Sequence, residues 1–174
     1  MVTDAGARAV AEDRDAAFDA YVLSRKASLL RTAYLLCGDL PTAEDLVQDA
    51  LAKLYLSWHR VQRRESLDGY VRRILVNEHH SLWRRAWKRR EVVSDALPEA
   101  GREDVLPEPD VEARVWSFVR SLPARQRSVV VLRYYEDLSE QEIAGILGVG
   151  PGTVKSQASK ALAHLRGLVE EVDR

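Results

Sequence analysis

The side chains of this sequence that could do covalent or metal chemistry are few and scattered. His79 and His80 are adjacent, so on a helix they point about 100° apart, and no cysteine pair with zinc-ligand spacing accompanies them. Asp45 and Asp49 could hold a divalent ion for phosphoryl chemistry, but no third carboxylate shares their face. The lone Cys37 reads as a small buried residue rather than a redox sensor. We therefore predict a non-enzyme with no catalytic residue, no metal site and no cofactor.

A helix-turn-helix is the clearest pattern, in the segment LSEQEIAGILGVGPGTVKSQASKALAHLR at positions 138–166. Ser139 followed by Glu142 predicts a capping box, and Gly148 and Gly150 end a short first helix. Pro151 suits the first position of a second helix. The spacing places small or polar side chains on the side of this second helix that faces away from its packed side. They are Thr153, Ser156 and Lys160, flanked by Gln157 and His164.

The alternative interpretation of this segment is a helical hairpin that only packs, because any surface helix turns polar residues outward. The joint occurrence of capped entry, short helix and glycine turn favours the DNA-binding motif. On that interpretation Gln157 favours adenine, and Lys160 favours guanine or phosphate.

A basic helix bearing tryptophans is the second pattern, predicted from about Leu67 to Arg90. Its predicted core side holds Leu67, Val71, Leu75 and Leu82, and the opposite side holds Arg72, Arg73, Val76, Asn77, His80, Trp83, Arg84 and Trp87. Arginine neutralises phosphates and indole rings stack on unpaired bases, so this face predicts binding of single-stranded nucleic acid. The alternative is that Trp83 and Trp87 simply pack against another helix.

The elements that must position these residues are all helices. Two further helices are expected in the first half, from about Ala16 to Cys37 and from near Pro41, the latter turning Asp45, Gln48, Asp49 and Lys53 outward. The second half adds helices near 111–121 and 123–135, the latter including the apolar run 129–132 as a buried helix. No strand pattern is strong. The fold class is therefore all-α, with two small helical domains.

Charge and proline content separate the two domains. Basic residues dominate from Arg60 to Arg90, whereas acids dominate from Asp95 to Glu112, a stretch that also contains three prolines. We predict an N-terminal tail at 1–13, a first domain at 14–92, a flexible acidic linker at 93–110 and a second domain at 111–174. No apolar run is long enough for a membrane span, and the acidic N-terminus lacks the features of an export signal, so a cytoplasmic protein without membrane insertion is expected.

The order of these motifs resembles the extracytoplasmic-function (ECF) group of RNA polymerase sigma factors. The matching stretches are AEDLVQD at 43–49, DGYVRRILVNEHHSLWRRAWKRR at 68–90, SLPARQRSVVVLRYYEDLS at 121–139 and GTVKSQASKALAHLR at 152–166. The sequence departs from the family pattern at Gly150, where a hydroxyl cap is common, and at Gln157 and Ala158, where an arginine-leucine pair is frequent.

The resemblance implies a factor that binds core RNA polymerase, recognises promoter DNA and helps to open it. The helix near Pro41 would dock on the clamp helices of the largest polymerase subunit through Asp45, Gln48, Asp49 and Lys53. The first domain would read the minus-ten element of the unpaired strand with Arg63, Arg64, Glu65, Ser66, Arg73, Asn77, His80, Ser81, Trp83, Arg84 and Trp87. The second domain would contact the polymerase flap and read the minus-thirty-five element with Gly152, Thr153, Lys155, Ser156, Gln157 and Lys160.

Further partners and functions stay open at this point. An anti-sigma factor is a candidate partner by the same resemblance. The alternative functions are a helix-turn-helix regulator whose first domain senses a ligand or dimerises, and a helical adaptor with no DNA partner. A sensor domain should contain a pocket or a dimer interface, whereas the outward face of the predicted first domain carries arginine and tryptophan.

Overall fold

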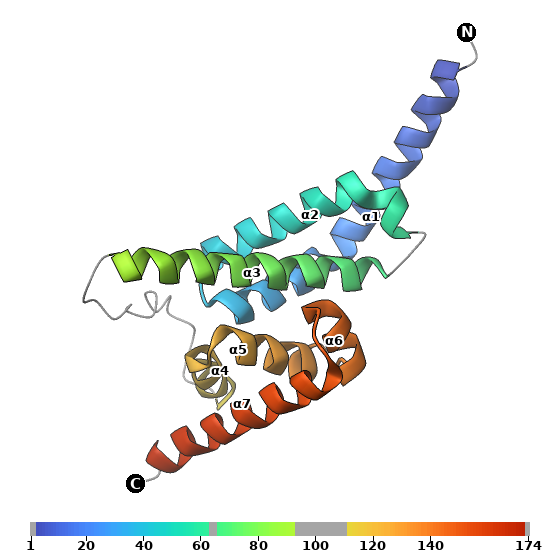
Figure 1. The fold of residues 1–174 in the computed structure, drawn as a ribbon. Helices are drawn as coiled ribbons and strands as arrows, with labels where there is room; N and C mark the ends of the chain where they lie inside the picture. Colours follow the sequence, from blue (N-terminus) through green and yellow to red (C-terminus); the bar gives the residue numbers. More distant parts are fainter. Residues whose placement is uncertain (1–2, 63–65, 93–110, 173–174) are drawn as a thin grey trace.

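The described part of the chain is entirely helical. The computed structural model describes residues 3–62, 66–92 and 111–172, and it contains no strand within these ranges (Figure 1). The helices are α1 (Thr3–Cys37), α2 (Leu40–Gln62), α3 (Leu67–Val92), α4 (Val111–Ser121), α5 (Ala124–Val130), the π-helical turn η1 (Val131–Tyr135), α6 (Glu140–Leu147) and α7 (Pro151–Val172). The predicted all-α class is confirmed. Helix α1 begins thirteen positions before the predicted Ala16, and the predicted linker at 93–110 lies outside the described residues.

Helices α1, α2 and α3 form the N-terminal half. Gly38 separates α1 from α2 with a φ of 90°, a backbone conformation that glycine adopts without steric cost, so the chain reverses and α2 packs against α1. The rings of Phe18 and Tyr21 meet that of Trp58 edge to face, at centroid distances of 5.5 and 5.9 Å. Leu54 and Leu75, both fully buried, fill the centre between α2 and α3.

Helices α4 to α7 form the C-terminal half. The β-branched run at 129–132 is helical and at most 4 % exposed, as predicted for a buried segment. It runs from α5 into η1, and both α5 and α6 pack against α7. The core of this half is therefore built around the short helix α5. The side of α7 that faces away from this core is exposed to solvent.

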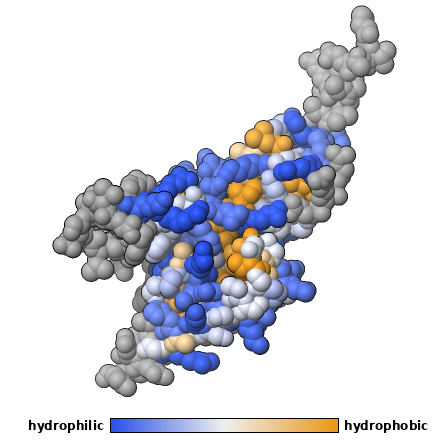
Figure 2. Space-filling model, viewed as in Figure 1, coloured by the Kyte–Doolittle hydropathy of each residue, from blue (hydrophilic) through white to orange (hydrophobic). Residues whose placement is uncertain are grey.

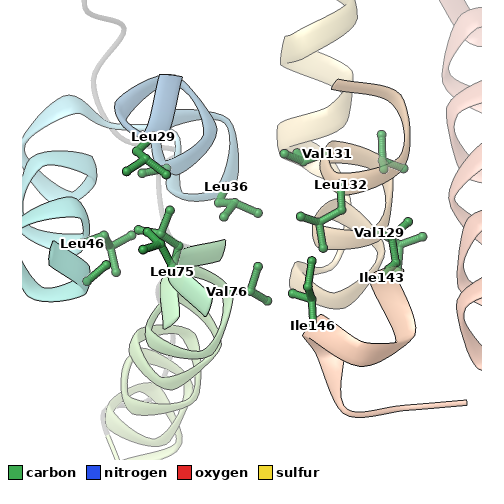
Figure 3. Close-up of a cluster of buried hydrophobic side chains, with 14 of the residues drawn as sticks. Leu29, Leu36, Leu46, Leu75, Val76, Val129, Val131, Leu132, Ile143 and Ile146 are labelled. Atoms are coloured by element: carbon green, nitrogen blue, oxygen red, sulfur yellow. The ribbon is translucent and has the colours of Figure 1, made fainter. Parts of the chain in front are cut away.

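The two halves pack directly on each other. Figure 3 shows Leu36 of α1 and Val76 of α3 pointing toward Leu132 and Ile146 of the C-terminal half. These four side chains belong to one continuous cluster of buried apolar residues. The sequence predicted two cores but not this contact between the two halves, which is called the joint below.

The joint corrects the predicted faces of α3. Val76, expected on the outward side, is 1 % exposed, because α5 and α6 cover that side of the helix. Leu82, expected in the core, is 38 % exposed, because it lies toward the end of α3 beyond the closest packing. Helix α3 is therefore a central layer with neighbours on two sides rather than a surface helix with one buried stripe.

Candidate nucleic-acid interface

The helix-turn-helix is built by the local interactions that its sequence predicted. The Ser139 hydroxyl accepts from the Glu142 backbone amide at 3.3 Å, and the Glu142 carboxylate accepts from the Ser139 amide at 2.8 Å. These hydrogen bonds lower the pKa of Glu142. Gly148 ends α6 in the left-handed conformation with a φ of 65°. Helix α7 then starts at Pro151, and the Gly150 carbonyl accepts from the amides of its first turn without any side-chain cap.

The two sides of α7 differ as a recognition helix requires. Val154, Ala158 and Ala161 are buried against the rest of the C-terminal half. The predicted minus-thirty-five residues lie on the opposite side. Gly152, Thr153, Lys155, Ser156 and Lys160 are exposed, and Gln157 is half-buried. A helix held by one apolar stripe with a small, polar and cationic outer face can enter a major groove.

Helix α3 brings together only part of the predicted minus-ten set. Asn77, Trp83 and Arg84 are exposed, whereas Arg73, His80 and Ser81 are half-buried. Ser66 is exposed at the start of the helix. Arg63, Arg64 and Glu65 and the side chain of Trp87 lie outside the described residues. Figure 2 shows hydrophilic residues along much of α3 on the visible face.

Polar contacts tie the covered side of α3 to the C-terminal half. His80 Nε2 lies 2.9 Å from Ser128 Oγ of α5. Arg72 forms an ion pair with Glu136, at 2.6 Å between Nη2 and Oε2. Sequence reasoning missed Ser128 and Glu136 as functional candidates, because no local pattern distinguishes a polar residue at a joint between two halves from one in solvent.

The outward side of α2 is a continuous polar stripe. Asp45, Gln48, Asp49 and Lys53 are all exposed, and the opposite side of the helix is buried in the N-terminal half. Lys53 forms an ion pair with Glu78 of α3. The other charged side chains of the stripe, Asp45 and Asp49, are acidic. The sequence predicted these four positions on one face, and the structure places them there.

The histidine, cysteine and acidic side chains bear on metal binding and on thiol chemistry. Among residues 3–62, 66–92 and 111–172, no group of three or more histidine, cysteine, aspartate or glutamate side chains could hold a metal ion. Burial raises the pKa of the Cys37 thiol to about 11, so the reactive thiolate is scarce at neutral pH. Within the same ranges no helix is both long and apolar enough to cross a bilayer.

Two sequence families account for both helical halves. Residues 21–89 match the family described as Sigma-70 region 2, and residues 112–165 match the family described as Sigma-70, region 4. The chain is 40 % identical over 149 residues to the RNA polymerase sigma-E factor of Streptomyces coelicolor, which covers 86 % of this chain and 84 % of that protein. It is 32 % identical over 166 residues to the ECF RNA polymerase sigma factor SigM of Mycobacterium tuberculosis, covering 92 % of this chain and 80 % of that one.

The chain belongs to the ECF group of RNA polymerase sigma factors. It is accordingly a transcription initiation factor that binds core RNA polymerase and recognises promoter DNA. This membership removes the alternatives of a regulator with a sensor domain and of an adaptor without DNA. It also confirms the family that the motif order indicated.

Two solved structures, one of them of a sigma factor, share the fold of this one. The sigma factor RpoE of Bartonella quintana, solved in complex with the anti-sigma factor NepR, superposes with a TM-score of 0.69 at 26 % identity, over 90 % of this chain and 98 % of that one. CnrH, solved with the cytosolic domain of CnrY, gives a TM-score of 0.65 at 23 % identity over 90 % of each chain. The helical arrangement of this sigma factor is therefore one that such factors adopt.

Proposed function

We propose that two separate helix faces of this sigma factor divide promoter recognition between them. The outer face of α7 reads the minus-thirty-five element as duplex, and α3 with the loop before it reads the minus-ten element as an unpaired strand. The single observation that carries the proposal is the contrast between the two sides of α7: Val154 is fully buried, while Thr153 and Lys160 are exposed.

The chemistry of each face suits a different form of DNA. On α7, Ser156 and Thr153 are short enough to let the helix backbone approach base edges, and Lys160 is long enough to reach a phosphate or guanine. On α3, Trp83 and Arg84 are both exposed. An indole ring stacks on a base only where that base is unpaired, at roughly 1–3 kcal/mol per stacked base, and a neighbouring guanidinium neutralises the strand.

The outward stripe of α2 is the proposed polymerase contact. Asp45, Gln48 and Asp49 supply carboxylate and amide groups on three exposed positions of one face, which favours a cationic partner surface. We assign this stripe to the clamp helices of the largest polymerase subunit, and the C-terminal half to the polymerase flap. We further propose that the protein acts in the cytoplasm and catalyses no reaction itself. We also propose that an anti-sigma factor binds it, as the anti-sigma factor NepR is bound to RpoE in the solved complex.

The test begins with start sites mapped by transcribing fragmented DNA of the source organism with purified core polymerase and this protein. On one promoter found in this way, Arg84→Ala and Lys160→Ala are compared. Arg84→Ala should lower the permanganate reactivity of unpaired thymines more than it lowers duplex binding. Lys160→Ala should weaken duplex binding and reduce the slope of log affinity against log salt by about 1. Equal loss in both assays for both variants would refute the division.

A further inference from the structure

A pocket with no assigned ligand lies between α3 and α6. Its volume is about 300 Å³, which is at the lower limit of the range for small-molecule sites. One wall comes from Ser66 and the first turns of α3, and the other comes from Leu138 and α6. Ser66, Glu142 and Gly145 are exposed, so the pocket opens to solvent and a small molecule can enter it.

Each of the two helices contributes a glycine to the pocket, although neither helix needs a glycine there. Gly69 and Gly145 lack the positive φ of Gly38 and Gly148, so other residues could adopt their backbone conformation. A Cβ atom added at Gly145 would meet nothing within 4 Å, and one added at Gly69 would meet only the Ser66 side chain, at an ordinary contact distance of 3.7 Å. Glycine within a helix lowers stability relative to alanine. The structural effect of the missing side chains is to keep the pocket open.

Apolar side chains form part of the wall on the C-terminal side. Leu138 is half-buried, and Ile146, at 8 % exposure, belongs to the cluster of buried apolar residues at the joint. Neither side chain offers a hydrogen bond, and the two glycines add no side-chain atoms. The part of a ligand that fills this space must therefore be apolar, because a polar group against these walls would lose its hydrogen bonds to water.

Three charged side chains also line the pocket, and they are Arg72, Arg73 and Glu142. Arg72 forms an ion pair with Glu136, and the Glu142 carboxylate is held in the capping box of α6. The Arg73 guanidinium lies over the ring of Tyr70, with 5.5 Å between Cζ and the ring centroid. A guanidinium has five N–H donors in its plane, and a contact through its face does not use them. Arg73 can therefore donate to an anionic group in the pocket.

We infer that this pocket binds a small carboxylate with a compact apolar body, of the aryl or short alkyl class. The carboxylate accepts from Arg73, and the body lies against Leu138 and Ile146, in the space that Gly69 and Gly145 leave open. Because the two walls belong to different halves of the protein, such a ligand contacts both halves at once and stabilises the arrangement in which they touch. The pocket binds it whether or not α3 reads the minus-ten element.

The test titrates the isotope-labelled full chain with phenylbutyrate and follows the backbone amide signals by NMR. Phenylbutanol, which has the same body and a neutral hydroxyl head, is the control ligand. Gly145→Leu fills the pocket with a side chain. Gly167→Leu is the control variant, because Gly167 is an exposed glycine of α7 where an added Cβ also meets nothing within 4 Å. Arg73→Gln removes the cation, and Gly145→Met repeats the test if the leucine variant fails to fold.

Phenylbutyrate should shift the signals of Gly69 and Gly145 saturably, with a dissociation constant on the order of 1 mM for a ligand of this size. Phenylbutanol should bind about tenfold more weakly, because it lacks the charge-assisted hydrogen bond. Arg73→Gln should remove this preference for the carboxylate. Gly145→Leu should abolish saturable binding, whereas Gly167→Leu should bind phenylbutyrate as the wild type does.

Three results would count against the pocket as a carboxylate site. Binding that survives Gly145→Leu unchanged, or signal shifts that avoid both pocket glycines, would place the ligand elsewhere and overturn the site. Equal affinities of phenylbutyrate and phenylbutanol would overturn the anionic class of the ligand. The absence of any saturable shift at millimolar phenylbutyrate would overturn both the site and the ligand class.

Discussion

His79 should make this protein sensitive to mild acid. The side chain is 2 % exposed, its Nε2 has no hydrogen-bond partner among the described residues, and burial lowers its pKa to about 3. An unfolded histidine titrates near 6.5, so below that pH the unfolded chain binds a proton that the folded chain excludes. The stability from this group is therefore complete above the unfolded pKa and declines as the pH falls. At pH 5, about 1.5 units lower, the loss is about 2 kcal/mol at 1.36 kcal/mol per unit.

The assay is urea unfolding at pH 7.5 and pH 5.0 of three proteins. His79→Leu replaces the buried imidazole with an apolar side chain that cannot bind a proton. His164→Leu makes the same change at an exposed position of α7 and serves as the control. Between the two pH values the wild type and His164→Leu should lose about 2 kcal/mol more of their free energy of unfolding than His79→Leu does. Burial also lowers the pKa of His80, so some pH dependence remains in His79→Leu.

The two carboxylates whose pKa is lowered by hydrogen bonds, Glu142 and Asp15, do not contribute to the difference between pH 7.5 and pH 5.0. Hydrogen bonds lower the pKa of Glu142 and Asp15, so the stability that they contribute is present above their ordinary values of 4.5 and 3.8 and is lost only at lower pH. The reasoning is wrong if His79→Leu retains the full pH dependence of the wild type. It is equally wrong if the His79 ring signals titrate near pH 6.5 in the folded protein.

Further predictions concern the helix cap, the core and the thiol. Ser139→Ala should lower the free energy of unfolding by about 1 kcal/mol because it removes the N-cap of α6. The control Ser24→Ala loses only an exposed hydrogen bond from its hydroxyl to a carbonyl within α1 and should not destabilise the protein. Equal unfolding midpoints of the two variants in urea would contradict this prediction. Leu75→Ala should cost about 2–5 kcal/mol at a fully buried site, and Leu23→Ala, at a position 86 % exposed, should stay within about 0.5 kcal/mol by the same measurement. Cys37 should react with a maleimide much more slowly in the folded protein at pH 7.5 than in urea, and equal rates would show that its thiol is not protected.

The helix-turn-helix could be predicted from sequence because its determinants are local. The capping box joins Ser139 to Glu142 within one turn, and Gly148 ends the helix through its own backbone conformation. Each feature depends on a few neighbouring residues, so the sequence contains the whole interaction. The polar face of α7 follows from the same helical period.

The joint between the halves could not be predicted in this way. A helical period separates one buried side from one exposed side, but α3 packs on two sides, so Val76 was expected at the surface and is buried. Glu136 lies 64 positions from its partner Arg72, and the Leu36 carbonyl lies 91 positions from Arg127, which donates to it. No spacing rule connects residues at such separations, and only the three-dimensional packing shows which polar side chains meet.

The central claim is that α3 and α7 contact different promoter elements in different forms. Photo-crosslinking tests it most directly, with p-azidophenylalanine placed at Trp83 or at Ser156 in the holoenzyme bound to a mapped promoter. The probe at Trp83 should crosslink to unpaired non-template bases about ten positions upstream of the start, and the probe at Ser156 to duplex about 25 base pairs farther upstream. Crosslinks from both probes to the same element, or none from the Trp83 probe to DNA, would contradict the claim.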